Sequence, residues 1–344
     1  MPVRCGRLPL CARLTPPSRA HPADSEFAGL RTSPPAVIDG VLIDTTLVRR
    51  LLTAQFPHWA RLPVTPVPKS GMDNATFRLG DELSVRLPRY AHWTGQVTRE
   101  QRWLPRLAPL LPLPVPEPVA QGTPGEGYPY PWSVYRWLDG ETATPEALAD
   151  PVRTALDLAG FLTALQGADP TGGPGPEQSN AFRGVPLGDD RDSIAHEARV
   201  RPKIEALGTA RLIDAGALTQ VWETALAAPA WHKPPVWVHG DLDAGNLLLR
   251  DGRLGAVIDF GTLAVADPAV DLQPAWKFLP AEARPVFREA VGADDATWAR
   301  ARGWALAGSL PVPDDPFFRD HPARVTAALH HLEQIIADYR TDGA

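Results

Sequence analysis

The chain has 344 residues, of which 44% are hydrophobic and 22% charged, so it can bury one or two sizeable cores. A formal net charge of −6 and a pI near 5.9 argue against a sequence-independent nucleic-acid binder. No apolar stretch approaches the roughly 18 residues that span a bilayer, and the only cysteines, Cys5 and Cys11, lie near the N-terminus. We therefore expect a cytoplasmic protein with no membrane or nucleic-acid partner, and a folded body without disulfides or cysteine-held zinc.

Residues 1–36 differ in composition from the rest of the chain. They are rich in proline and arginine, and the first acidic residue is Asp24. Proline-rich segments cannot bury a core, so we expect a disordered or over-called N-terminal extension, with a transit peptide as the alternative. The folded chain should begin near Ile38, ahead of Asp44, which offers an N-cap for an amphipathic helix starting near Leu47.

Two strands joined by a turn are predicted next. Residues 75–79 and 82–87 are mainly apolar, and Gly80 between them is typical of a tight turn. The polar segment 70–74 precedes the first strand, and by itself an ordinary turn would explain it. The pattern predicts a small antiparallel lobe over residues 37–136.

A helix follows over residues 97–104. Val97, Glu100 and Leu104 share one face of it, so Glu100 is a polar residue on an otherwise apolar stripe. An inward glutamate needs a cationic partner, and Arg86 on the preceding strand is the candidate. The alternative is that Glu100 is an ordinary surface residue of the helix.

Apolar residues alternate again over residues 130–138, which predicts the last strand of the small lobe. A large lobe, residues 137–344, then opens with a helix over residues 145–165. The segment 167–184 is rich in glycine and proline, and several acidic residues follow it. We expect this region to form the acceptor side of the site, since long loops in compact domains are often functional. A solvated charge run is the alternative.

A β-hairpin is predicted over residues 247–258. The dipeptide Asp251-Gly252 is a strong two-residue turn between two apolar runs. If the strands pair directly across this turn, Asn246 falls opposite Val257. Asp259 then lies just beyond the same open end of the hairpin.

The apolar run 236–238 predicts a buried strand that delivers His239 and Asp241 beside that end. Two oxygen ligands and a free carboxylate are what phosphoryl transfer from a magnesium nucleotide requires. Asp259 would hold Mg²⁺, and Asn246 would supply a neutral oxygen. Asp241 would accept the proton of the attacking hydroxyl, or orient the attacking oxygen. The alternative is a solvated hairpin with incidental Asp and Asn residues, which suits single residues better than the joint pattern.

With these residues the chain resembles the aminoglycoside phosphotransferase and choline kinase-like family, the small-molecule branch of the protein-kinase-like superfamily. The family's catalytic loop reads His-Gly-Asp, with Asn five residues after the Asp, and here it is residues 239–246. A later Asp opens the family's metal loop, here residues 259–261. Gly240 matches this branch, because protein kinases usually have Arg there. Asp267 follows Gly261 by six positions, which leaves no room for a long activation loop. The resemblance implies an α+β, protein-kinase-like bilobal fold, with a small antiparallel β-sheet N-lobe and a larger, mostly helical C-lobe.

The resemblance also implies roles outside the catalytic loop. The 70–74 loop would cover the nucleotide phosphates, Arg86 would replace the phosphate-pairing lysine, and the backbone of the 130–140 hinge would bind adenine. His239, Asp267 and Asp271 would order the catalytic and metal loops. The two aspartates at a proline-containing helix start also suit N-terminal capping. The candidate nucleotide-binding residues are Gly71, Asn74, Arg86, Glu100, Ser133, Tyr135 and Trp137.

The sequence thus predicts an enzyme, a small-molecule kinase that uses ATP or GTP with Mg²⁺ to phosphorylate a hydroxyl group. The acceptor is left open among aminoglycosides, other antibiotics and amino alcohols, and the acidic chain suits a cationic one. No obligate protein partner is expected. One alternative is a protein kinase, which Gly240 and the short segment after Gly261 disfavour. The other is a nucleotide-binding regulatory module without turnover, which the intact Asp241, Asn246 and Asp259 disfavour.

Removal of residues 1–35 should leave the protein's melting temperature and its nucleotide affinity unchanged, because such a proline-rich segment has no core of its own to contribute. The comparison is between the full chain and one beginning at Ala36, by thermal unfolding and nucleotide titration. A fall of several degrees on truncation would show that the segment packs on the folded body.

Overall fold

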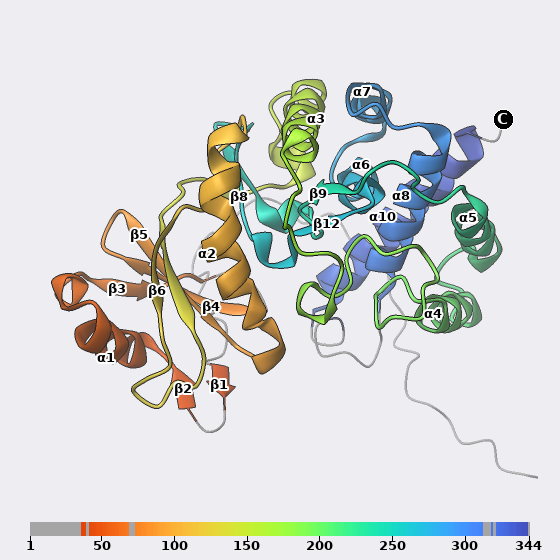
Figure 1. Ribbon diagram of the computed structural model, residues 1–344. Coiled ribbons are helices and arrows are strands. Elements are labelled where there is room, and N and C mark those ends of the chain that lie inside the picture. Colours follow the sequence, from red (N-terminus) through yellow and green to blue (C-terminus); the bar gives the residue numbers. More distant parts are fainter. Residues whose placement is uncertain (1–35, 39–40, 69–72, 312–317, 319–320, 343–344) are drawn as a thin grey trace, which may run out of the picture.

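The computed structural model describes residues 36–38, 41–68, 73–311, 318 and 321–342. It has a small lobe built on an antiparallel sheet and a larger, mostly helical lobe (Figure 1). The small-lobe sheet has five strands in the order β3-β4-β5-β7-β6. The predicted α+β, kinase-like fold class is confirmed. The five strands are β3 (Val64–Pro66), β4 (Asn74–Leu79), β5 (Leu83–Pro88), β6 (Pro118–Gly122) and β7 (Trp132–Arg136).

The centre of this sheet places Arg86 between two neighbours. In the β4–β5 pair Arg86 lies opposite Thr76, and in the β5–β7 pair it lies opposite Ser133. The short hairpin β1 (Ala36–Ile38) and β2 (Val41–Ile43) precedes helix α1 (Thr45–Gln55). Asp44 caps α1, as the sequence predicts, by accepting a 2.8 Å hydrogen bond from the backbone N–H of Leu47.

Helix α2 (Gly95–Leu107) joins the sheet to the large lobe, and runs between the two in Figure 1. Trp103 and Leu104 on this helix belong to the hydrophobic core of the large lobe. Glu100 is only 1% exposed, on the same inward side. The structure therefore has the apolar stripe with one buried carboxylate that the sequence pattern predicts.

The large lobe is mostly helical and is packed around buried tryptophans. Trp222, Trp237, Trp276, Trp298 and Trp304 are all at most 2% exposed. The helices are α3 (Pro151–Gly167), α4 (Glu197–Thr209), α5 (Ala215–Ala227), α6 (Pro274–Lys277), α7 (Arg284–Ala290), α8 (Asp295–Ser309) and α10 (Pro322–Asp342). The short strands are β8 (Glu141–Thr142), β9 (Val236–Val238), β10 (Leu247–Arg250), β11 (Arg253–Val257) and β12 (Ala264–Ala266). No described helix is long and apolar enough to cross a membrane.

The hairpin β10–β11 forms as predicted, but its register is shifted by one residue. Arg250 pairs with Arg253 across the turn, whereas Leu248 pairs with Ala256 because Gly255 is left over in a β-bulge. Leu247, and not Asn246, therefore lies opposite Val257. The expected pairing of Asn246 with Val257 is wrong. The backbone N–H of Ile258 instead donates to the carbonyl of Asn246 at 2.9 Å, which still leaves Asp259 at the open end.

The buried apolar residues form two clusters, one around the five-stranded sheet and one through the large lobe. The large-lobe cluster also takes in Tyr135 of β7 and the inner face of α2. The division of the chain at residues 136 and 137 stays a prediction.

Candidate active site

The catalytic loop begins where β9 ends, at the buried His239. The carboxylate of Asp271 accepts hydrogen bonds from the backbone N–H of His239 (2.6 Å) and of Gly240 (2.7 Å). Gly240 has φ +86°, and a Cβ there would lie 2.7 Å from the carbonyl oxygen of Thr262, so the turn requires glycine. Asp271 does not act as the cap that its sequence position suits, but orders the catalytic loop, which is the role that the resemblance implies. Its carboxylate is fully buried and is used to hold the catalytic loop.

Asp267 is the residue that caps. Its Oδ1 accepts from the backbone N–H of Ala269 at 3.0 Å, at the start of the 3₁₀ turn Pro268–Leu272. Its Oδ2 binds Arg300 of α8 at 2.7 Å. Asp267 thus ties the segment after the metal loop to the helical core.

His239 connects the catalytic loop to the metal loop. Its Nδ1 accepts from the backbone N–H of Asp241 (3.3 Å), so Nε2 carries the proton and donates to the carbonyl of Ile258 (3.0 Å). Its ring packs on Phe260 with centroids 4.6 Å apart. Because Ile258 and Phe260 flank Asp259, the histidine fixes the distance between the two loops.

Asp241 and Asn246 lie side by side in the catalytic loop. The Nδ2 of Asn246 donates to the backbone carbonyl of Asp241 at 2.7 Å and approaches its carboxylate at 3.5 Å. The Asp241 side chain is 47% exposed, which leaves it accessible to an incoming acceptor. With its nitrogen engaged, Asn246 has its amide oxygen available for a cation.

Asp259 is held in the left-handed backbone region, at φ +65° and ψ +68°. Its Oδ1 accepts from Nη2 of Arg86 at 2.9 Å, while Nη1 of Arg86 lies 3.4 Å from Glu100. Burial alone would raise the pKa of Asp259, but the charge and hydrogen bond of Arg86 hold that pKa below its usual value. Arg86 therefore joins β5, α2 and the metal loop through one guanidinium.

Glu100 has a second partner in Tyr135, whose hydroxyl donates to its other carboxylate oxygen. Burial raises the pKa of Glu100, and the charge of Arg86 opposes this shift. Burial also raises the pKa of Tyr135, so the phenol stays protonated and remains a donor. The inward glutamate is thus satisfied by one cation and one hydroxyl.

The other candidate nucleotide-binding residues lie on the same side of the small lobe. Asn74 is buried at the start of β4, where its side-chain amide pairs with that of Gln96 on α2 at 3.3 and 3.4 Å. Ser133 of β7 turns its hydroxyl toward α2, and Trp137 is half-buried at the connection between the lobes. Gly71 lies outside the described residues. The roles of these residues in binding nucleotide stay predictions.

Two charged residues at the site were missed by the sequence reasoning. Asp73 precedes β4, and burial followed by the charges of Asp259 and Asp241 raises its pKa to about 7. Arg183 from the 167–184 segment places Nη2 at 3.2 Å from Asp241. Asp73 belongs to the polar loop singled out in the sequence, but nothing in that loop distinguishes it. No sequence signal links Arg183 to a residue 58 positions away.

The charges of the site suit a divalent cation. Asp73 is close enough to Asp259 and Asp241 for their charges to raise its pKa, and the charges of Arg86 and Arg183 oppose this shift. Among the described residues, no group of three or more His, Cys, Asp or Glu side chains could hold a metal by itself. Mg²⁺ commonly takes one or two protein oxygens and completes its shell with phosphates and water, so Asp259 and Asn246 would be enough to hold it.

The negative charge of Asp243 is paired away from the metal loop. Its carboxylate binds Lys277 of α6 rather than facing the metal loop. The extra negative charge that the sequence places beside the candidate base is therefore neutralised locally.

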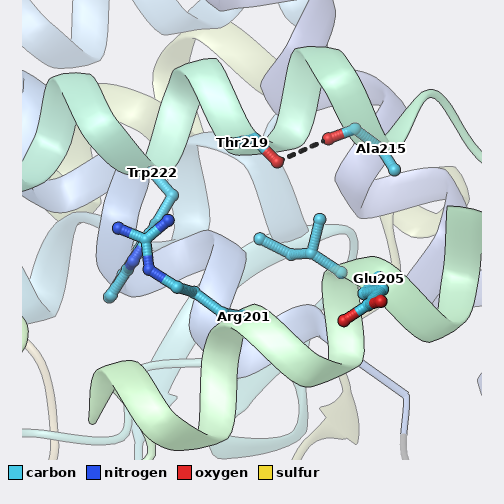
Figure 2. A pocket seen from close by; sticks show the side chains of 6 residues that line it. Arg201, Glu205, Ala215, Thr219 and Trp222 are labelled. Atoms are coloured by element: carbon cyan, nitrogen blue, oxygen red, sulfur yellow. Dashed lines mark hydrogen bonds between the residues drawn. The ribbon is translucent and has the colours of Figure 1, made fainter.

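A separate hollow of about 240 Å³ lies between α4 and α5 (Figure 2). Within it the hydroxyl of Thr219 bonds the carbonyl of Ala215 one turn earlier, at 2.9 Å. The lining residues are Arg201, Ile204, Glu205, Ala215, Thr219 and Trp222. None of them belongs to the catalytic or metal loop, so the hollow is not part of the candidate active site.

The fold and the gathered loops define a class of protein, a kinase-like phosphotransferase. Residues 64–304 match the phosphotransferase enzyme family (APH), and the chain belongs to this family. The family and the class of enzyme predicted from the catalytic loop, a small-molecule kinase, are confirmed. No curated protein sequence matches the chain at a significant level.

Solved structures with the same fold include aminoglycoside and macrolide phosphotransferases. The GDP and kanamycin complex of APH(2")-IIIa is 20% identical, covers 85% of this chain and 98% of its own, and has a TM-score of 0.62. The streptomycin–ATP–APH(2")-IIa ternary complex is 19% identical, with coverages of 85% and 97% and a TM-score of 0.51. Macrolide 2'-phosphotransferase MphH from Brachybacterium faecium is 24% identical, with coverages of 82% and 97% and a TM-score of 0.52. At these identities the likeness establishes the fold.

The raised pKa of Asp73 predicts a pH dependence of stability. Between the ordinary pKa of 3.8 and about 7, the folded protein holds a proton that the unfolded chain has lost. The stability that this provides is fully present below pH 3.8 and is lost as the pH rises through 7. In magnesium-free, nucleotide-free buffer, Asp73→Asn should therefore lose less stability than the wild type between about pH 4 and pH 7. Parallel melting-temperature curves for the two proteins would contradict this.

The shared guanidinium of Arg86 predicts energetic coupling with Glu100. Arg86→Ala and Glu100→Ala should be strongly non-additive, by about 1–3 kcal/mol in the free energy of magnesium–nucleotide binding. Loss of Arg86 leaves Glu100 buried without its cation, and loss of Glu100 leaves Arg86 held by Asp259 alone. Titration calorimetry of the two single variants and the double variant measures it. The exposed pair Arg340 and Asp214, 2.8 Å apart, is the control and should be additive. Additivity at Arg86 and Glu100 would contradict the expectation.

Proposed function

We propose that this protein transfers the γ-phosphoryl group of ATP or GTP to a hydroxyl group of a small molecule. The observation that carries the proposal is the convergence of Asp241, Asn246 and Asp259 at one end of a hairpin, with Arg86 reaching them from the small lobe. These residues would supply a carboxylate base, two metal ligands and a phosphate-binding cation within one site.

Each residue has a chemical role in this reaction. Asp241 accepts the proton of the acceptor hydroxyl, whose oxygen attacks the γ-phosphorus. The bond from that phosphorus to the bridging oxygen breaks, and the nucleoside diphosphate leaves with the bonding electrons. Asp259 and Asn246 would hold Mg²⁺, which neutralises charge on the phosphates. Arg86, positioned by Glu100, would grip phosphate oxygens in the forked geometry of a guanidinium.

The nucleotide would sit between β7 and the loop before β4. Residues 133–136 are part of β7, the strand that pairs with β5, so Arg86 and this part of the hinge lie on neighbouring strands. Similar structures contain GDP or ATP, which supports a purine nucleotide without selecting one of them. Trp137 is packed against Arg78 at 4.6 Å and would border the base.

A small acceptor is favoured over a protein. The chain passes from Gly261 directly into β12, which pairs with β9, and then into the capped turn at Asp267. The described chain after the metal loop is thus part of the core and leaves no segment for docking a peptide. We propose an aminoglycoside, a macrolide or an amino alcohol as acceptor, since similar structures carry kanamycin or streptomycin or belong to a macrolide phosphotransferase.

An acceptor panel tests the proposal. Purified protein with magnesium and ATP, or magnesium and GTP, is incubated with single aminoglycosides, macrolides and amino alcohols. Diphosphate release and the mass of the acceptor are measured, and a gain of one phosphoryl group identifies the substrate. Phosphorylation of a protein such as casein with no small-molecule product would overturn the proposed acceptor class.

Substitutions separate binding from chemistry within the site. Asp259→Asn should weaken magnesium–nucleotide binding and turnover together, because it removes an anionic metal ligand. Asp241→Asn should change nucleotide affinity by no more than a few-fold, yet lower turnover by about 10²–10⁴, the usual contribution of a positioned base. Asn246→Ala should lie between them, since water can partly replace a neutral ligand.

The measurements are nucleotide titration with and without magnesium, together with turnover of the acceptor found in the panel. Asp157→Asn on the surface of α3 is the control, where an ion pair with Arg153 is lost and neither quantity should change. Loss of magnesium–nucleotide binding in Asp241→Asn, with normal binding in Asp259→Asn, would reverse the assignment of base and metal ligand.

A further inference from the structure

Arg183 lies at the centre of the candidate site although it comes from the segment between α3 and α4. Its Nη2 is 3.2 Å from Oδ1 of Asp241, and its side chain is 13% exposed. A Cβ on Gly240 would lie 3.0 Å from the Cβ of Arg183. The catalytic loop therefore packs directly on this arginine, and a side chain at position 240 would displace it.

A tightly built loop presents Arg183. Asn180 is fully buried, and its side chain bonds the backbone of both Gly175 (2.9 Å) and Glu177 (2.7 Å). Ala181 and Phe182 then follow with φ of +53° and +52°, two consecutive left-handed residues that are not glycine. Such strain persists only where the surroundings enforce it, and it clusters at functional sites. The strain immediately precedes the arginine that contacts the catalytic aspartate.

Both lobes fasten this loop. Arg99 of α2 donates to Glu177 at 3.2 Å, to the hydroxyl of Ser179, and to the carbonyl of Gly261 in the metal loop. On the other side, the backbone N–H of Asp267 donates to the carbonyl of Gly184 at 3.4 Å. Arg183 is thus held in a fixed position relative to the metal loop and the catalytic loop.

The guanidinium is incompletely used. Its Nε is buried and has no hydrogen-bond partner among the residues that the structure describes. Nε and Nη2 form the edge of a guanidinium that grips an oxyanion by two parallel bonds, and here only Nη2 is engaged. A buried donor without a partner calls for one, and the charge of Arg183 also acts on Asp73 across the site. A phosphate oxygen beside Asp241 would satisfy it.

We propose that Arg183 is a further catalytic residue, which holds Asp241 in place and donates its unused Nε–H to the γ-phosphoryl group during transfer. The inference rests on the proposed function. As the acceptor oxygen bonds to the phosphorus and its proton passes to Asp241, the diphosphate departs with the bonding electrons. Negative charge is spread over the three remaining oxygens of the moving group. A guanidinium held at that place stabilises this charge once its buried Nε–H is uncovered to the phosphoryl group.

The test compares nucleotides with and without a γ-phosphoryl group. Wild type and Arg183→Gln are titrated with magnesium–ADP and with the magnesium complex of the β,γ-imido analogue of ATP. Arg183→Gln should bind ADP within about two-fold of the wild type, since ADP lacks the contacted group. It should bind the imido analogue about 10- to 100-fold more weakly, the worth of a charge-assisted hydrogen bond. Arg183→Lys should recover part of this loss.

Turnover adds a second readout. With the acceptor from the panel, kcat of Arg183→Gln should fall by about 10²–10³, the usual effect of removing one preorganised donor. Arg340→Gln, which removes an exposed guanidinium from its pair with Asp214, is the matched control and should change neither nucleotide affinity nor kcat. Melting temperatures of all variants show whether each one folds, and Arg183→Lys serves if Arg183→Gln does not.

The outcomes distinguish the two proposals. If the wild type binds neither nucleotide, the proposed function has failed. If the wild type binds both and Arg183→Gln binds the imido analogue as tightly and turns over as fast, the role of Arg183 is refuted and the proposed function stands. Equal weakening toward ADP and the analogue would also refute the γ-phosphoryl contact, because it would show a general effect on the nucleotide site.

Discussion

The Arg86 guanidinium, shared between Asp259 and Glu100, is the interaction on which the geometry of the site depends. It is the point where β5 of the small lobe, helix α2 and the metal loop meet. Glu100 is fully buried, so a charge there is tolerable only because Arg86 and the Tyr135 hydroxyl both reach it. Breaking such a pair by removing one partner costs about 3–5 kcal/mol, since the remaining charge stays buried. The ion pairs of Arg86 therefore help to fix how the two lobes are aligned, and the apolar packing of α2 agrees with that alignment.

Backbone conformation is the second constraint. The catalytic loop needs φ +86° at Gly240, and Asp259 adopts φ +65° to aim its carboxylate at Arg86. A left-handed aspartate is uncommon and is maintained by its surroundings, here the His239 ring on Phe260 and its bond to Ile258. Asp271 holds the catalytic loop in a similar way, by accepting hydrogen bonds from the backbone of His239 and Gly240. The reactive side chains are thus positioned mainly by residues that do not touch substrate.

Local features were predictable from the sequence. Asp251-Gly252 predicted a hairpin turn, and Asp44 predicted a helix cap. The place of Glu100 on an apolar helix face predicted its ion pair with Arg86. Each of these depends on neighbours within a few residues or on one helix face. The β-bulge at Gly255 was not predictable from apolar patterning, since both registers bury leucines, and it shifted Asn246 by one position. The position of Asp271 beside a proline suited a cap, yet it lies inside the turn Pro268–Leu272 and its partners lie 31 and 32 residues earlier. Asp73 and Arg183 meet the catalytic loop only through the tertiary fold, so one sequence holds no local sign of them.

The distant residues Asp73, Arg86 and Arg183 act on one another through their charges within the site. Burial, followed by the charges of Asp259 and Asp241, raises the pKa of Asp73 against the opposing charges of Arg86 and Arg183. In the proposed function these carboxylates would repel a free polyanionic nucleotide, whereas a magnesium nucleotide would bring a positive charge to them. Arg86 and Arg183 approach from opposite lobes, so in the proposed function each guanidinium would exchange a carboxylate partner for a phosphate oxygen, at little net cost in charge. We propose on the same ground that the carboxylates beside the accessible Asp241 favour an acceptor with amino groups near its hydroxyl, because a cation there would lower the repulsion that an anionic acceptor would increase.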